Sequence, residues 1–133
     1  RFTQSGPGEF DTPHALAMDS SGRLFVGDRG NNRAQIFDQE GNFLQEWGQF
    51  GRPSGIYIDH NDILYVTDSS SSPRNNPGME RGIRIASVSD GKVFAFIDDP
   101  DEVGTQEGVV ADSAGNVYGS LTAGMALRKY TKK

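Results

Sequence analysis

Few side chains in this sequence could carry out chemistry, because its 133 residues include no Cys and only two His. His14 follows a Pro near the start of a short apolar segment, and Ser54 and Glu107 occupy the equivalent places in two later segments. An imidazole can bind a metal ion, transfer a proton or be satisfied by backbone and water. His14 is therefore a candidate metal ligand, with Glu107 as the candidate beside it, and an ordinary structural His remains the alternative.

Charged residues stand a short distance after each of these positions. Asp28–Arg29 and Asp68–Ser69 are equivalent pairs, and a polar insertion from Ser69 to Arg81 adds Arg74 and Arg81. A guanidinium can hold a carboxylate or another anion. We expect Arg29, Asp68, Arg74 and Arg81 to bind a ligand, although Asp68 could instead accept backbone N–H groups in a turn and the insertion could be a plain surface loop.

The elements that position these residues follow from an internal repeat. Three segments share an Asp, a polar turn, and then Leu or Val followed by an aromatic residue, and they align without gaps. They begin at Asp19, Asp59 and Asp112. Each Asp ends one strand, and the polar residues after it form a hairpin turn into the next strand.

Further alternating segments complete the pattern. Third strands are expected at 33–37, 82–86 and 126–130, and fourth strands at 43–47 and 92–97, with none in the last repeat. Four-stranded antiparallel units at this spacing are typical of β-propeller blades. The sequence predicts an all-β propeller fragment within a single partial domain, 1–133, with blades at about 10–48, 52–98 and 105–131. The alternative is an antiparallel sandwich.

Blade geometry then places the candidate residues together. The start of the first strand and the end of the second lie at the same end of an antiparallel blade. His14, Ser54 and Glu107 should therefore share one rim with Arg29 and the insertion. This rim is the expected binding surface for a peptide or small-molecule ligand.

The amino-acid sequence of the repeat resembles that of a known family. Pro13–Asp19 followed by Leu24–Phe37 is similar to an NHL repeat, and the similarity runs from about Gly6 to Lys129. The resemblance implies a propeller of six blades, of which this chain would be the C-terminal half. Because three blades leave two apolar faces bare, the expected partner is either the missing N-terminal half or a second copy of the chain.

A narrower resemblance is carried by Pro13–Ala17 with Asp28–Arg29 and Asn32–Arg33, which is similar to peptidyl-α-hydroxyglycine α-amidating lyase. It implies a zinc-dependent lyase in which His14 is a metal ligand, Glu107 stands where a second ligand is expected, and Arg29 is catalytic. It also implies a structural calcium ion in the channel. The rest of such a site would lie outside this chain, so a non-catalytic ligand-binding scaffold is the first interpretation and the lyase is the alternative.

Composition removes several other functions. The 18 acidic residues outnumber the 13 Lys and Arg, giving a net charge of −5 and no basic stripe for nucleic acid. No apolar run is long enough to span a bilayer, so no membrane partner is expected. No Ser-His-Asp, P-loop or Rossmann motif is present. The compartment stays open, with an extracellular or periplasmic location favoured.

Overall fold

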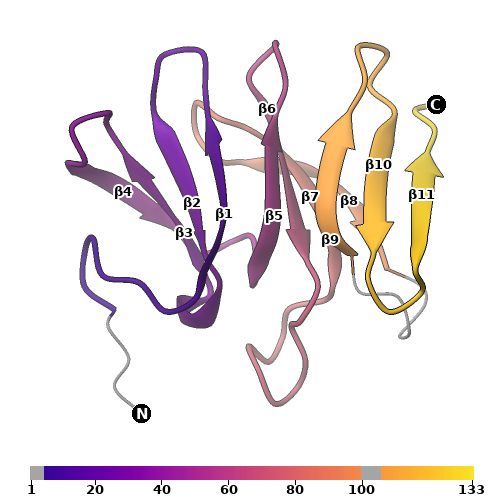
Figure 1. Cartoon of the computed structure of the whole chain (residues 1–133), viewed down its shortest axis with the longest axis horizontal. Coiled ribbons are helices and arrows are strands. Elements are labelled where there is room, and N and C mark those ends of the chain that lie inside the picture. The colour runs from indigo at the N-terminus through magenta and orange to yellow at the C-terminus, as the bar shows by residue number, and fades with distance from the viewer. Residues whose placement is uncertain (1–4, 100–105) are drawn as a thin grey trace.

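The computed structural model describes residues 5–99 and 106–133, and its strands form three antiparallel sheets that stand side by side (Figure 1). The first sheet has the order β1-β2-β3-β4, and a short 3₁₀ turn, η1, follows β2. The bounds are β1 (Pro13–Met18), β2 (Leu24–Asp28), η1 (Arg29–Asn31), β3 (Arg33–Phe37) and β4 (Phe43–Trp47). All four strands were expected from the alternating sequence.

The second and third sheets repeat this order with one difference. The second is β5-β6-β7-β8, whereas the third contains only β9, β10 and β11. Their bounds are β5 (Pro53–Ile58), β6 (Ile63–Asp68), β7 (Gly82–Ser87), β8 (Val93–Asp98), β9 (Gln106–Ala111), β10 (Val117–Leu121) and β11 (Ala126–Tyr130). The all-β fold with a three-stranded last blade is confirmed. The expected start of the third blade at 105 lies outside the described residues.

The recurring Asp shapes the hairpin turn in every sheet. Oδ1 of Asp19, Asp59 and Asp112 accepts the backbone N–H groups of the residues two and four positions later, at 2.9–3.0 Å. The residue three positions after each Asp has a positive φ, which Gly adopts without strain. The repeat is thus a turn motif in which one carboxylate replaces the missing backbone acceptors.

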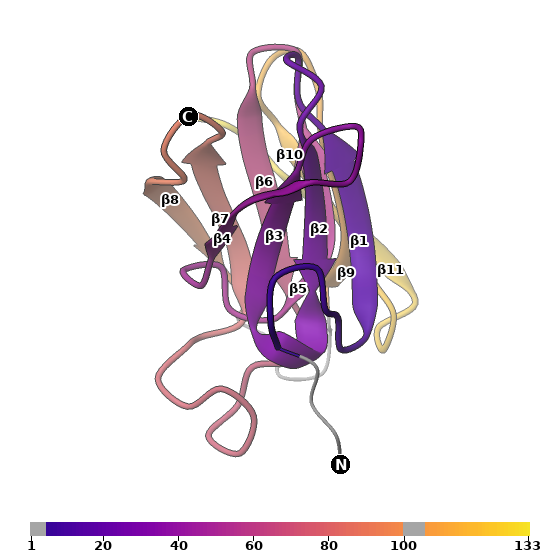
Figure 2. The same cartoon turned by 90° about the vertical axis from the view of Figure 1, so that its left-hand side faces the viewer.

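The larger apolar core lies between the first and second sheets. It contains aromatic and aliphatic side chains from both, namely Phe25, Ala34, Ile36, Trp47, Phe50, Leu64, Val66, Ala86 and Val88. Trp47 packs with its ring centroid 5.7 Å from that of Phe25 and 6.1 Å from that of Phe50. Figure 2, turned to look from the first sheet, shows the sheets stacked behind one another.

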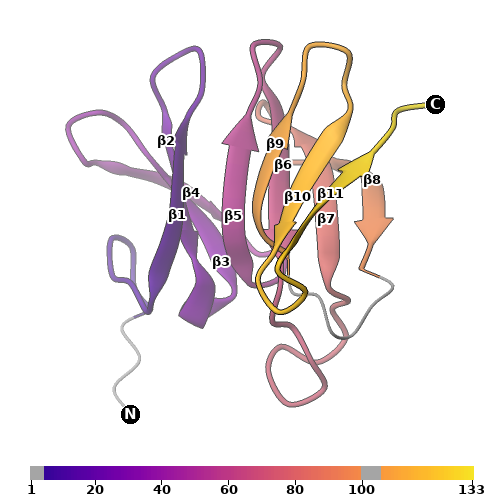
Figure 3. The ribbon, with the colours of Figure 1, turned by 45° about the vertical axis from the view of Figure 1, so that its right-hand side comes forward.

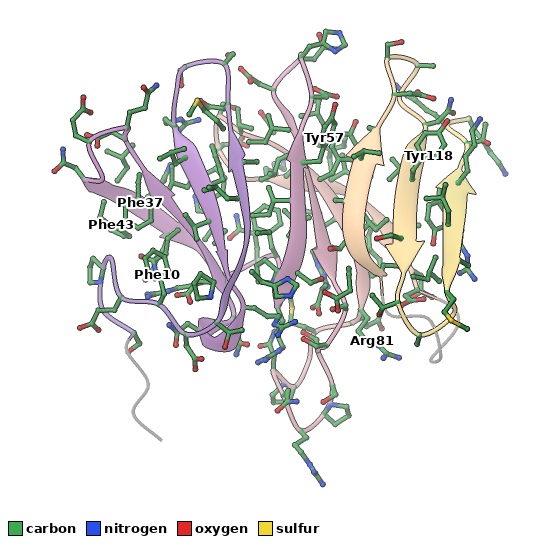
Figure 4. All side chains as sticks on the ribbon, viewed as in Figure 1. Phe10, Phe37, Phe43, Tyr57, Arg81 and Tyr118 are labelled. Atoms are coloured by element: carbon green, nitrogen blue, oxygen red, sulfur yellow. The ribbon has the colours of Figure 1, made fainter. Side chains whose placement is uncertain are left out.

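A smaller core joins the second sheet to the third. Its buried members are Tyr65, Ile83, Val109 and Val117, with Tyr57 and Tyr130 among the half-buried residues around them. The remaining faces of the first and third sheets have no neighbouring sheet in the described chain. Phe10, Phe37 and Phe43 gather on the first (Figure 4), and Val110 and Leu127 are exposed on the third.

Within the ranges that the structure describes, no helix has the length and apolar character needed to cross a membrane. The division of the chain into a single partial domain stays a prediction.

Candidate functional site at the channel rim

Each innermost strand carries a β-bulge at the same place. The pairing of β1 with β2 skips His14, that of β5 with β6 skips Ser54, and that of β9 with β10 skips Glu107. A bulge leaves its extra residue outside the ladder and re-aims its side chain. The three residues that the repeat made equivalent are therefore the three bulged residues, at the lower end of the sheets in Figure 1.

The His14 ring reaches across the second sheet. Its Nδ1 lies 2.7 Å from the backbone oxygen of Ser54, and its Nε2 lies 3.7 Å from Oε2 of Glu107. A carbonyl oxygen can only accept, so Nδ1 carries the hydrogen and Nε2 holds the free lone pair in the neutral ring. The side chain is 35% exposed, which leaves Nε2 accessible beside a carboxylate.

Glu107 is held by the second sheet. Ser69 Oγ donates to Glu107 Oε1 at 3.1 Å, and Thr67 Oγ1 donates to the Glu107 backbone oxygen at 3.2 Å. Ser54 is buried and its hydroxyl lies within hydrogen-bonding distance of Thr67 and of the Gln106 backbone oxygen. The cluster of His14, Ser69 and Glu107 thus joins all three sheets.

The two Asp residues that end the second strands are both buried, and their partners differ. Oδ2 of Asp28 accepts from Arg33 Nε at 2.8 Å and from Gln35 Nε2 at 3.0 Å. Arg33 also donates to Glu46 and to three backbone oxygens of the segment before β1. Burial by itself would lower the pKa of Arg33. The hydrogen bonds to Asp28 and Glu46 have the larger effect, so the pKa of Arg33 is raised above its ordinary value.

Asp68 occupies the same position in the second sheet with fewer partners. Its Oδ1 accepts the N–H groups of Ser70 and Ser71, at 3.1 and 2.9 Å. Its Oδ2 is buried 3.7 Å from Arg84 Nη1, and neither atom makes a hydrogen bond in the described structure. Burial lowers the pKa of Arg84, with Asp68 opposing the shift. Asp68 therefore orders the start of the insertion, and its proposed contact with a ligand stays a prediction.

The three candidate Arg residues lie at the same end of the molecule. Arg29 begins the 3₁₀ turn after β2 and is half-buried, and its side chain makes no hydrogen bond or ion pair within residues 5–99 and 106–133. Arg74 is exposed in the inserted loop. Arg81 lines a pocket of about 510 Å³ with Met79 and Asp98 (Figure 4). The structure does not bring Arg74 or Arg81 into contact with the His14 cluster.

A zinc or calcium ion at the rim would need more donors than the described residues supply. Catalytic zinc sites use three protein ligands, and the described part of the chain contains no group of three His, Cys, Asp or Glu residues that could hold a metal ion. His14 and Glu107 supply two donors. These residues alone do not fit a complete zinc or calcium site, so no reaction step is derived from either metal.

Sequence reasoning missed two parts of the cluster. The repeat makes Ser69 equivalent to Arg29 and places it at the start of the insertion, and its residue type alone does not predict that its hydroxyl donates to the Glu107 carboxylate. The Ser54 carbonyl, which orients the His14 ring, could not be recognised from a residue type. The exchange of Arg29 for Ser at the equivalent place was the available signal.

Comparison with known proteins supports the interpretation of the repeat. A family model described as the NHL repeat matches residues 10–37, which include all of β1, β2 and β3. The matched residues include the Asp28–Arg33–Gln35 network.

Curated relatives match part of this chain. NHL repeat-containing protein 3 of Homo sapiens is 48% identical over 44 residues, which are 32% of this chain and 13% of that protein. Protein lin-41 of Caenorhabditis elegans is 50% identical over 42 residues, 32% of this chain and 4% of that protein. The chain thus matches only a small part of each relative.

The fold is shared with a solved propeller. The WD40 β-propeller domain of Doa1 superposes with a TM-score of 0.67 at 17% identity, covering 89% of this chain and 36% of that one. At this identity the likeness shows the fold alone. The three sheets thus have the fold of β-propeller blades, and the first of them matches the NHL repeat over residues 10–37.

Proposed function

We propose that the chain is a binding scaffold whose channel rim holds a short peptide through its charged ends. The observation that carries the proposal is the triple bulge, which turns His14, Ser54 and Glu107 out of three consecutive ladders toward one rim. Residues on a rigid β-scaffold can be placed for binding without rearrangement, which lowers the entropy lost on association.

The side chains of the rim favour a ligand that carries both an ammonium group and a carboxylate. The Glu107 carboxylate is oriented by Ser69 and is 26% exposed beside the free Nε2 of His14, so both can accept hydrogen bonds from an ammonium group. Arg29, after β2 of the first sheet that also carries His14, has a guanidinium without an ion pair among the described residues. It could receive a carboxylate.

The test is an NMR titration with tri-alanine, compared with N-acetylated tri-alanine and with the C-terminal amide. Saturable shifts of the Glu107 and His14 signals are expected with the free peptide. Acetylation should weaken binding by about tenfold or more through loss of the ammonium, and amidation should weaken it less, because the ammonium has two acceptors, Glu107 and His14, whereas the carboxylate has Arg29 alone. Equal responses to all three peptides would contradict the proposal.

The matched variants are Glu107→Gln and Glu40→Gln. The first removes the charge at the rim with little change of shape, and the second removes an exposed carboxylate from the turn between β3 and β4, at the opposite end of the first sheet. Only Glu107→Gln should abolish the difference between free and acetylated peptide. Arg29→Gln should abolish the difference between the acid and the amide.

A second candidate is a metal-dependent lyase site completed by residues outside this chain, as the resemblance to the amidating lyase implies. One observation favours it: the Nδ1–H donation to Ser54 leaves His14 Nε2 as a free ligand atom 3.7 Å from Glu107 Oε2. A backbone carbonyl on the second nitrogen is the usual arrangement for a metal-ligating His.

Zinc titration of a longer protein that also contains the blades completing the site, purified without a nickel column, tests this candidate. Calorimetry should detect one Zn²⁺ site that His14→Ala removes and that His60→Ala, in an exposed turn, leaves unchanged. No heat from the wild-type protein, or equal heat from both variants, would contradict it. Because tri-alanine binding needs no metal, the two candidates can fail separately.

The proposed structural partner is a set of further blades that close the ring. Leu16 and Met18 on the first sheet are 65% and 51% exposed, although Ile56 and Ile58 at the equivalent positions of β5 pack on the larger core. The other proposed partner, a second copy of the chain, would have to present the third sheet there. That sheet has Lys129 where the first sheet has Ile36, so a different blade fits better.

A further inference from the structure

Each sheet contributes two side chains to the channel rim. The first rim position is the bulged residue of the innermost strand, and the second rim position directly follows the second strand. In chain order the first rim positions are His14, Ser54 and Glu107, and the second rim positions are Arg29, Ser69 and Thr122. The innermost strands β1, β5 and β9 follow one another across the molecule (Figure 3), so both contacts between neighbouring sheets have their two partners in the described chain.

The contact between the second and third sheets shows how these positions meet. Ser69, the second rim position of the second sheet, donates from Oγ to Oε1 of Glu107, the first rim position of the third sheet, at 3.1 Å. Two residues before Ser69, Thr67 Oγ1 donates to the Glu107 backbone oxygen at 3.2 Å. The second rim position of one sheet therefore faces the first rim position of the next.

The contact between the first and second sheets follows the same arrangement. Arg52, just before β5, donates from Nη1 at 2.9 Å to Oδ1 of Asn32, which ends the turn that Arg29 begins. A Cβ added to Gly27, near the end of β2, would lie 3.0 Å from the Cβ of the residue before Ser54. The repeat therefore places Arg29 toward Ser54.

The acidic and the basic side chain thus stand at different contacts. Opposite Glu107 is the hydroxyl of Ser69, and opposite Arg29 is the buried Ser54. A hydroxyl can share a hydrogen bond with a charged group but carries no charge to neutralise it. An Arg and a Glu at the same contact would form a charge-assisted pair, and the rim would then offer a ligand neither charge. The offset by one sheet keeps the Glu107 carboxylate, which is 26% exposed, and the half-buried Arg29 available to a ligand.

We infer that Ser69 is a positioning residue that makes the rim selective for zwitterionic ligands. Its hydroxyl fixes one oxygen of Glu107 and leaves the negative charge for an ammonium group, whereas an Arg there, as at the equivalent place in the first sheet, would neutralise the carboxylate. Arg29, opposite an uncharged residue, stays available for a carboxylate. The inference rests on the peptide binding proposed above and names the residue that sets its specificity.

Substitution of Ser69 by a cation tests the inference without a ligand. Ser69→Arg places a guanidinium at the contact that holds Glu107, and the first sheet already accommodates Arg29 at the equivalent position. Ser69→Lys brings the same charge on a different head group. Ser69→Met is the matched control, because its side chain is long and uncharged.

Urea denaturation measures the new ion pair. Glu107→Gln should lower the urea midpoint more in the Ser69→Arg and Ser69→Lys proteins than in the wild type or the Ser69→Met protein, because only the cationic side chains lose a charged partner. An equal shift in all four backgrounds would overturn the inference.

The three tri-alanine peptides test the selectivity by NMR titration. The Ser69→Arg protein should bind the free peptide about tenfold more weakly than the wild type does, and no more tightly than the acetylated peptide, while still preferring the acid to the amide. The Ser69→Met protein should keep both preferences. The exchange of Arg29→Ser with Ser69→Arg leaves the net charge unchanged and should remove both preferences.

Two results would contradict the assigned role of Ser69. One is a Ser69→Arg protein that still prefers the free to the acetylated peptide, and the other is an exchanged protein that keeps either preference. A wild-type protein that binds none of the three peptides would contradict the proposed function, and the urea comparison would still support or overturn the placement of Ser69 opposite Glu107.

Discussion

The two contacts between neighbouring sheets involve equivalent strand positions but bury different numbers of residues. Between the first and second sheets, Trp47 and Phe50 complete a core in which nine residues are buried. Between the second and third, four residues are buried and an apolar pocket of about 310 Å³ remains. Part of the difference lies in the side chains of the preceding sheet, because Trp47 is buried in the larger core whereas Ile97, at the equivalent position of β8, is only half-buried.

The largest expected effect is at Trp47. Trp47→Ala should lower the free energy of unfolding by about 3 to 5 kcal/mol, because it leaves a cavity between Phe25 and Phe50. The matched change is Ile97→Ala, at the equivalent position of β8, where the side chain is only half-buried and the loss should be about 1 to 2 kcal/mol. Urea denaturation measures both. Equal losses would mean that the two contacts are packed alike.

The buried carboxylates extend the comparison to polar groups. Asp28→Asn should cost about 3 kcal/mol, because it removes the charge of the buried one of the two carboxylates that pair with the Arg33 guanidinium. Asp68→Asn keeps an acceptor for the N–H groups of Ser70 and Ser71, and its Oδ2 makes no hydrogen bond in the described structure, so about 1 kcal/mol is expected. The same unfolding experiment applies. A larger loss at Asp68 would show that its 3.7 Å contact with Arg84 is the stronger pair.

The alkaline titration of Tyr65 extends the comparison to the smaller core. Burial, together with the negative charge of Asp59, raises the pKa of Tyr65 to about 12. The unfolded chain therefore loses this proton first, so stability is complete below pH 10 and falls as the pH rises from 10 to 12. Ultraviolet difference spectra should show one Tyr titrating near 12, and Tyr65→Phe should flatten the stability profile in this window. A normal titration would mean that water reaches the ring.

Much of the fold could be predicted from the sequence, because the turn after each Asp depends on local hydrogen bonds that a short motif encodes. The alignment of His14, Ser54 and Glu107 followed from the same motif. The contacts between these residues did not, since they depend on three bulges and on a backbone carbonyl. The identity of adjacent residues could not reveal that Arg74 and Arg81 project from the insertion without contacting the rim cluster.

The most direct test of the rim geometry is the tautomer of the His14 imidazole. Long-range ¹H–¹⁵N correlation spectra, recorded at a pH where the ring is neutral, show which nitrogen carries the hydrogen. The donation to the Ser54 carbonyl predicts a hydrogen on Nδ1 and a free Nε2 whose ¹⁵N shift changes when Glu107 is replaced by Gln. A hydrogen on Nε2, or an Nε2 signal that does not respond to Glu107→Gln, would contradict the account that the three bulged residues form one site.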